Sequence, residues 1–145
     1  MPLTSVSNSP LQLSRREDRE AALALLYEAD MTGDSIESVL ERHAVDPHEY
    51  STVIVAGVAA MLTQIDAAID QVAEDWAIDR MPGIDRSILR MSTYELFAEP
   101  DVPVTAVVSE AVALANQYST EKSAPFVNGV LVTLGDILRR TDESE

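Results

Sequence analysis

The apolar residues of this chain recur at helical spacing over almost its whole length, and this periodicity constrains the fold more than any other feature. In one C-terminal segment they stand at positions i, i+3, i+4, i+7 and i+11, a pattern that places them on one face of a helix. They are Val127, Val130, Leu131, Leu134 and Leu138. No segment alternates apolar and polar residues as a half-buried strand does. The sequence therefore predicts an all-α protein.

Proline, glycine and capping residues divide this pattern into about six or seven helices. Ser14 and Glu17 have the spacing of a capping box, which predicts that the first helix begins there. Pro47 opens another helix, because proline suits the first helical position. The predicted helices cover residues 15–30, 34–43, 47–76 with one break near residue 63, 85–97, 103–118 and 123–138.

The cluster Met81-Pro82-Gly83 interrupts the helical pattern and predicts a boundary between two subdomains, at about residues 15–80 and 84–140. Residues 1–14 are rich in serine and carry two prolines, which predicts a flexible N-terminal tail. Residues 141–145 predict a short acidic tail. The chain is therefore expected to form one helical domain in two parts.

Composition and motifs argue against several classes of protein. The chain has no cysteine, which excludes disulfides and thiolate metal sites. It shows neither a signal peptide nor an apolar stretch long enough to span a membrane, so we expect a cytoplasmic protein. His43 and His48 lack the i, i+4 spacing of a helical ligand pair, so no metal site is expected. No nucleophile motif or phosphate-binding loop occurs, so we expect no cofactor and no enzyme.

The net charge of −15 limits where a nucleic acid could bind. Residues 17–79 hold fifteen acids and two arginines, whereas residues 80–140 hold seven acids and six bases. An acidic surface repels nucleic acid. Any RNA site must therefore be local, within a group of cations.

The first such group is Arg15, Arg16 and Arg19, at the start of the first predicted helix. Cations in a first helical turn oppose the helix dipole, so helix stability does not explain them. Two interpretations stay open. The arginines bind a phosphate backbone, or the neighbouring acids Glu17 and Asp18 neutralise them as ordinary helical partners.

The second group is Lys122 and Phe126, one turn apart at the start of the last predicted helix. A cation beside an aromatic ring is suited to stacking a base and pairing with its phosphate. The alternative is a core phenylalanine beside a solvated lysine. The residues alone leave both interpretations open.

Three segments in the second half resemble the signature of a known family. They are Arg80–Pro82 with Ile84–Arg90 and Tyr94–Leu96, then Asp101–Pro103 with Ser109–Ala115, and finally Ser119–Leu131. The last segment is the most specific. The order and spacing of these segments resemble those of NusB transcription antitermination factors. The similarity extends from Arg15 to about Leu138.

The resemblance implies an all-helical fold of two small bundles and a function without catalysis. It implies binding of boxA-type RNA together with NusE, a small-subunit ribosomal protein, in the RNA polymerase antitermination complex during ribosomal RNA transcription. The implied RNA-binding residues are Arg15, Arg16, Arg19, Lys122 and Phe126. The implied partner-binding residues are Tyr27 and Asp85.

Two alternatives use the same fold. In the first, the chain is a protein–protein interaction scaffold or a homodimer that has lost RNA binding. In the second, it is the detached RNA-binding module of an RNA cytosine methyltransferase, although no methyltransferase domain follows. A continuous positive surface around the arginines and Lys122 favours RNA binding, whereas acids placed among those cations favour the scaffold.

Overall fold

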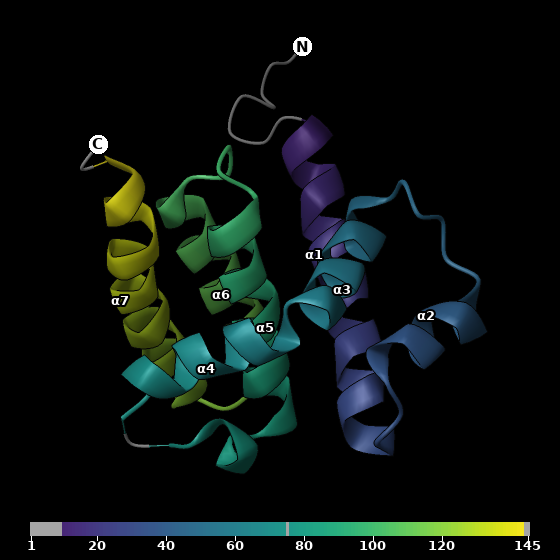
Figure 1. Ribbon diagram of the computed structural model, residues 1–145, viewed down its shortest axis with the longest axis horizontal. Helices are drawn as coiled ribbons and strands as arrows, with labels where there is room; N and C mark the ends of the chain where they lie inside the picture. The colour runs from purple at the N-terminus through teal and green to yellow at the C-terminus, as the bar shows by residue number, and fades with distance from the viewer. Residues whose placement is uncertain (1–9, 75, 144–145) are drawn as a thin grey trace.

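The computed structural model describes residues 10–74 and 76–143, and these residues form seven α-helices, one 3-10 turn and no strand (Figure 1). The elements are α1 (Pro10–Thr32), α2 (Ile36–His43), α3 (Tyr50–Ala60), α4 (Leu62–Val72), η2 (Ile78–Arg80), α5 (Gly83–Ala98), α6 (Val104–Tyr118) and α7 (Ser123–Glu143). The all-α prediction is therefore confirmed. Most of the predicted N-terminal tail and the end of the acidic tail lie outside the described residues.

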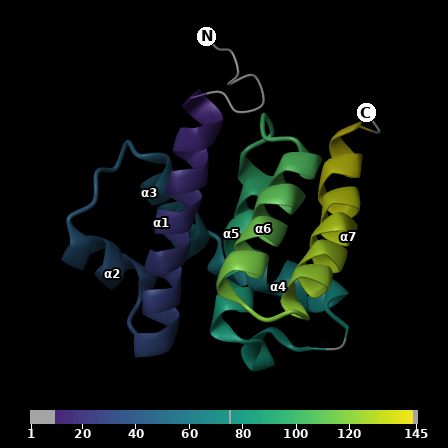
Figure 2. The ribbon, with the colours of Figure 1, turned by 180° about the vertical axis from the view of Figure 1, so that it is seen from behind.

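The helices pack in two groups around α5 (Figures 1 and 2). In the first group α1 lies against α2 and α3, and in the second α4, α6 and α7 lie against α5. Since α5 also contacts α1 and α3, one hydrophobic cluster runs through both groups, with Ile54 and Val58 of α3 and Ile88 and Leu89 of α5 fully buried.

The chain passes from one group to the other at Met61, and not at the predicted boundary Met81-Pro82-Gly83. There α3 and α4 meet at an angle of 80°. Beyond this bend α4 buries Ile65 and Ile69 and packs mainly on α5 and α7. No single described helix is long and apolar enough to cross a membrane, although α3 and α4 together pass that test by length and composition.

Four predicted helix ends differ from the structure by three or more residues, one of them the end of α7, which continues to Glu143 instead of ending at about residue 138. Helix α1 begins at Pro10, so Ser14 lies within the helix and not at its start. Helix α3 begins at Tyr50 instead of Pro47, because residues 46–49 form a turn in which Glu49 N donates to Asp46 O at 3.2 Å. Helix α4 ends at Val72, before the predicted end at Trp76.

A glycine allows α3 and α5 to approach closely. A Cβ atom added at Gly57 would collide with the ring of Tyr94, whereas one added at Gly129, an exposed position of α7, would meet nothing within 4 Å. The two glycines therefore make a matched pair inside helices.

We expect Gly57→Ala to destabilise the protein by about 1–3 kcal/mol, since the added methyl overpacks the α3–α5 contact. Gly129→Ala should instead stabilise it by roughly 0.5–1 kcal/mol through lower backbone entropy in the unfolded chain. Urea unfolding of both variants measures the difference. Equal effects of the two substitutions would contradict the close approach.

Candidate nucleic-acid interface

The structure places Arg19 inside the protein, which corrects its prediction as an RNA contact. Its guanidinium donates to Glu95 of α5 through Nε at 3.1 Å and Nη2 at 2.8 Å, and only 6% of the residue is exposed. Tyr50 of α3 donates to the same carboxylate at 2.6 Å. Burial opposes the charge, but the hydrogen bonds and attraction of Glu95 outweigh it and raise the pKa of Arg19. Arg19 thus joins α1 to α5 and is not free for phosphate.

A sequence signal for this burial exists. Arg19 stands three, four and seven residues before the buried Ala22, Leu23 and Leu26, and so continues the apolar face of α1. Glu95 lies in the same way on the buried face of α5, four residues after Met91. A charged residue on each of two apolar faces is a signal for a buried ion pair.

Arg16 is exposed but already paired. Its Nε and Nη2 donate to the carboxylate of Glu110 on α6 at 3.2 and 2.9 Å. The side chain of Arg16 is 51% exposed and that of Glu110 is 19% exposed. The hydrogen bonds that Arg16 donates to Glu110, together with the negative charge of that carboxylate, raise the pKa of Arg16. An exposed pair of this kind contributes little to stability, so the guanidinium can exchange this carboxylate for a phosphate at small cost.

Arg15 stacks on an aromatic ring instead of pairing with an acid. Its guanidinium carbon lies 4.2 Å from the centroid of the Tyr50 ring. Burial, together with the Glu95 carboxylate, raises the pKa of Tyr50, so the phenol stays protonated. A shallow hollow beside this pair is lined also by Glu17, Asp18 and His48. Because α1 begins at Pro10, Arg15 lies beyond the first turn, and the helix dipole has little influence on it.

The second predicted group lies at the start of α7 and gains a residue that the sequence analysis missed. Phe126 is half-buried and its ring centroid lies 5.5 Å from that of Trp76, with the ring planes inclined at 58°. Lys122 is exposed and forms no ion pair among the residues that the structure describes. These three residues line a cavity of about 250 Å³ with Asp85, Thr120 and Ser123. The sequence pattern assigned Trp76 to a helix end, which concealed its place beside Phe126.

Asp85 is fully buried, which corrects its prediction as a direct partner contact. Its carboxylate accepts hydrogen bonds from the hydroxyls of Ser119 at 2.6 Å and Ser123 at 2.9 Å. These bonds attach the start of α5 to the start of α7. An Asp85→Lys variant would therefore place a charge in the interior and disturb the fold as well as any interface.

Tyr27 remains accessible at the predicted partner surface. It is half-buried and lines a mainly apolar hollow of about 210 Å³ with Leu23, Ile84 and Tyr118. Tyr118 is 46% exposed, and its hydroxyl donates to Glu20 at 3.1 Å. An apolar hollow with polar aromatic groups at its edge is typical of a protein-binding surface.

The structure does not bring the two predicted RNA-binding groups together. In both ribbon views α1 begins at the upper end of the molecule and α7 begins at the lower end, with α5 and α6 between them (Figures 1 and 2). Arg15 and Arg16 lie near the start of α1, and Lys122 and Phe126 lie near the start of α7. A ligand that contacts both groups must extend along the molecule.

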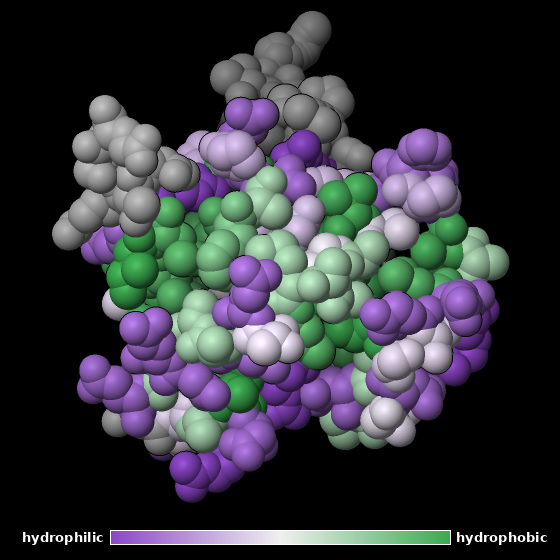
Figure 3. Space-filling view, viewed as in Figure 1, coloured by the Kyte–Doolittle hydropathy of each residue, from purple (hydrophilic) through white to green (hydrophobic). Residues whose placement is uncertain are grey.

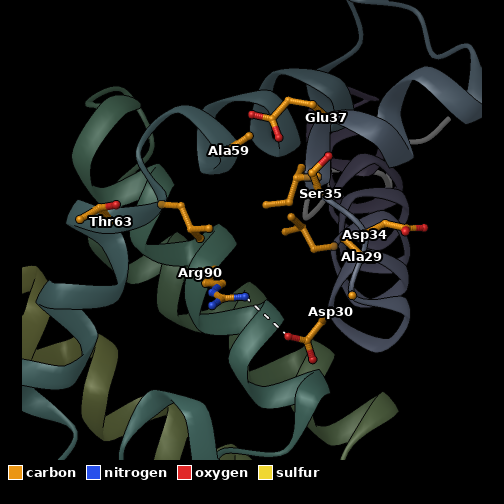
Figure 4. Close-up of a pocket in the computed structure, with 12 residues that line it drawn as sticks. Ala29, Asp30, Asp34, Ser35, Glu37, Ala59, Thr63 and Arg90 are labelled. Carbon is orange, nitrogen blue, oxygen red and sulfur yellow. Dashed lines mark ion pairs between the residues drawn. The ribbon is translucent and has the colours of Figure 1, made fainter.

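Another hollow, of about 500 Å³, lies between the end of α1, the start of α2 and the α3–α4 bend (Figure 4). Asp30, Asp34 and Glu37 line it together with Arg90. Arg90 lies 3.7 Å from Asp30 and also donates to Asp66 in a bidentate pair. The hollow therefore offers an anionic ligand no free cation among its lining residues.

The chain is similar to proteins of one family over most of its length. A model of the NusB family matches residues 16–136. The transcription antitermination protein NusB of Beutenbergia cavernae is 43% identical over 141 residues, covering 87% of this chain and 90% of that protein. The protein of the same name from Acidothermus cellulolyticus is 42% identical, covering 83% and 86%.

Solved structures agree with this result. T. maritima NusB superposes with a TM-score of 0.76 at 31% identity, covering 89% of this chain and 92% of that one. The antitermination factors NusB and NusE have been crystallised in complex with dsRNA. A chain of that structure superposes with a TM-score of 0.72 at 27% identity, covering 86% of this chain and 97% of its own length.

Because Arg19 is buried and Arg16 is exposed, we expect substitutions of these two arginines to change the stability of the protein by different amounts. Arg19→Met keeps much of the side-chain volume but leaves Glu95 charged and buried, which should cost about 3–5 kcal/mol. Arg16→Met removes an exposed pair and should cost less than about 1 kcal/mol. Denaturant unfolding compares the two variants. Similar small losses in both would show that the Arg19–Glu95 pair does not hold α1 to α5.

Proposed function

The chain belongs to the NusB family, and on that premise we propose that it is a transcription antitermination factor that binds boxA-type RNA together with NusE. It acts as a binding protein in the cytoplasm, within the RNA polymerase antitermination complex, and carries out no catalysis. Arg15, Arg16, Lys122 and Phe126 contact the RNA, and Tyr27 contacts NusE.

The accessible pair Lys122 and Phe126 carries this proposal. The ammonium is exposed at the edge of a cavity whose wall is the Phe126 ring, and the one carboxylate lining that cavity, Asp85, is occupied by two serine hydroxyls. A cation beside an aromatic wall fits a nucleotide, whose base stacks and whose phosphate pairs with the cation. Arg15 and the exchangeable Arg16 add two phosphate contacts at the start of α1.

RNA binding depends on NusE, because only a few cations of this chain remain accessible to RNA. Arg19 is buried in its ion pair with Glu95, and Arg16 is paired with Glu110. Few cations of this chain are therefore available to bind phosphate groups of the RNA. Each lost phosphate contact weakens binding. NusE therefore supplies the missing contacts, and the acidic first half of the chain attracts this basic ribosomal partner.

The scaffold or homodimer remains a second candidate, because acids do lie among the cations. Glu95 and Glu110 neutralise two of the three arginines at the start of α1. The surface over α7 is also hydrophobic (Figure 3), with Val132 44% exposed and Ile137 49% exposed. An exposed apolar surface favours contact with another protein.

RNA binding is tested with a boxA oligomer, NusE and variants at several salt concentrations. Substituting Arg15 and Arg16 by alanine should lower affinity and flatten the salt dependence, by roughly 0.7–0.9 in the logarithmic slope per lost phosphate contact. Phe126→Ala should lower affinity without changing the slope, since stacking releases no counterions. Without NusE, the wild-type protein should bind weakly.

The control is Arg42→Ala, which removes one exposed arginine of α2 that pairs with Glu28 and Asp34. It should leave both affinity and slope unchanged. If the double arginine variant and Phe126→Ala also bind as the wild type does, RNA binding at these residues is wrong and the scaffold becomes the better description.

Partner binding is tested at Tyr27. Tyr27→Ala should weaken NusE binding by more than about 1 kcal/mol, because tyrosines in apolar hollows are frequent hot spots. Phe97→Ala removes an exposed aromatic ring near the C-terminal end of α5, away from this hollow, and should leave affinity unchanged. Calorimetry with purified NusE measures both variants. A wild-type affinity for Tyr27→Ala would exclude this hollow from the interface.

A further inference from the structure

Trp76 is the only tryptophan of the chain, and 42% of it is exposed. It lies in the segment between α4 and η2, against Phe126 of α7. Leaving a large part of an indole in water forgoes the stabilisation that its burial would give. Core packing therefore explains the contact between the two rings but does not explain the exposed part of Trp76.

The geometry of the two rings decides how a flat ligand can bind. Their centroids are 5.5 Å apart and their planes are inclined at 58°, so the rings already touch each other. A base cannot enter between them. It can stack on the exposed face of one ring while the other closes the corner, and Trp76 is the more exposed of the two.

The remaining lining residues fit a nucleotide. Lys122 is exposed at the edge of this cavity of about 250 Å³, within reach of a phosphate that follows a stacked base. Thr120 is exposed beside it, and its hydroxyl lies 3.0 Å from that of Ser123, which donates to Asp85. The site thus has an aromatic wall, a cation and a polar group, but no free carboxylate among its lining residues.

Both walls of the cavity are fixed before any ligand binds. Asp85 holds the start of α7, which carries Lys122 and Phe126, through its hydrogen bonds with Ser119 and Ser123. The segment after Trp76 is held to α4, because Ile78 N donates to Asp70 Oδ1 at 2.8 Å. A site fixed in this way loses less conformational entropy when a ligand binds.

We propose that Trp76 is the main stacking platform for one unpaired RNA base, with Phe126 as the second wall of the corner and Lys122 paired with the adjoining phosphate. This proposal rests on the function proposed above and adds Trp76 to the RNA-binding residues. The ligand is a single-stranded nucleotide, because the face of a paired base is covered by its neighbours in the stack.

The single tryptophan allows a direct test. A boxA oligomer is titrated into the protein–NusE complex while tryptophan fluorescence is recorded, and the same titration with Trp76→Phe subtracts any signal from NusE. Quenching of the Trp76 signal by the single-stranded oligomer, and much weaker quenching by the same sequence in a duplex, is the expected result.

Affinity is measured in parallel by fluorescence anisotropy of labelled RNA. Trp76→Ala should weaken binding between about fivefold and 150-fold with an unchanged salt slope. Trp76→Phe should restore most of the loss, because a smaller aromatic ring still stacks. Phe97→Ala is the matched control and should bind as the wild type does. Circular dichroism and urea unfolding establish that each variant is folded.

The outcomes separate the two proposals. If the complex binds RNA but Trp76→Ala keeps wild-type affinity and no quenching occurs, the Trp76 platform is wrong while the proposed function stands. If Trp76→Phe loses as much affinity as Trp76→Ala, stacking is also the wrong explanation. If the wild-type complex binds no RNA at all, the proposed function fails and this inference fails with it.

Discussion

The position of α1 depends on the buried ion pair between Arg19 and Glu95. Removing two charges from water costs several kcal/mol per ion, and only good geometry with further hydrogen bonds compensates for this cost. Here the guanidinium binds both carboxylate oxygens, and the Tyr50 hydroxyl gives the carboxylate a third donor. Since these residues belong to α1, α5 and α3, one charged cluster sets the register among three helices. A shift of α1 along α5 would break both Arg19–Glu95 bonds together.

The same helix, α5, also controls the other end of the interface. Glu95, near its C-terminal end, fixes α1, which presents Arg15 and Arg16. Asp85, at its N-terminal end, fixes the start of α7, which presents Lys122 and Phe126. Both acids are buried and neither is available to a ligand. Two residues of one helix therefore determine how far apart the proposed RNA-binding groups lie, and an RNA bound to both would have to span that fixed separation.

The fold was predictable from the sequence because helical periodicity is a local property. The all-α class, the number of helices and the starts of the last three helices, within two residues, follow from apolar spacing and from helix breakers, whereas the end of α7 lies five residues beyond its predicted limit. The capping pattern at Ser14 was misleading, since the first helix begins further back, at Pro10.

The candidate site was less predictable than the fold. The burial of Arg19 depends on a partner 76 residues away, and the contact of Trp76 with Phe126 depends on how α4 packs against α7. Neither contact can be predicted from the spacing of neighbouring residues, although the position of Arg19 on the apolar face of α1 did indicate that it is buried.

The net charge of −15 does not prevent RNA binding, because electrostatic repulsion is local in salt. At physiological ionic strength charges separated by more than about 8 Å are largely screened. What an approaching phosphate experiences is therefore the nearest few side chains and not the whole acidic chain. Near the start of α7 those include the exposed Lys122, the exposed Glu121 that precedes it, and the Asp85 carboxylate, which two hydroxyls hold in the interior. Near the start of α1 they are Arg15 stacked on Tyr50, Arg16 paired with Glu110, and the acids Glu17 and Asp18 that line the hollow beside Arg15. The two ends of the interface thus differ in kind. In the proposed complex the α7 end, which is open and aromatic, selects an unpaired base, whereas the α1 end exchanges one anion for another and contributes mainly salt-dependent affinity.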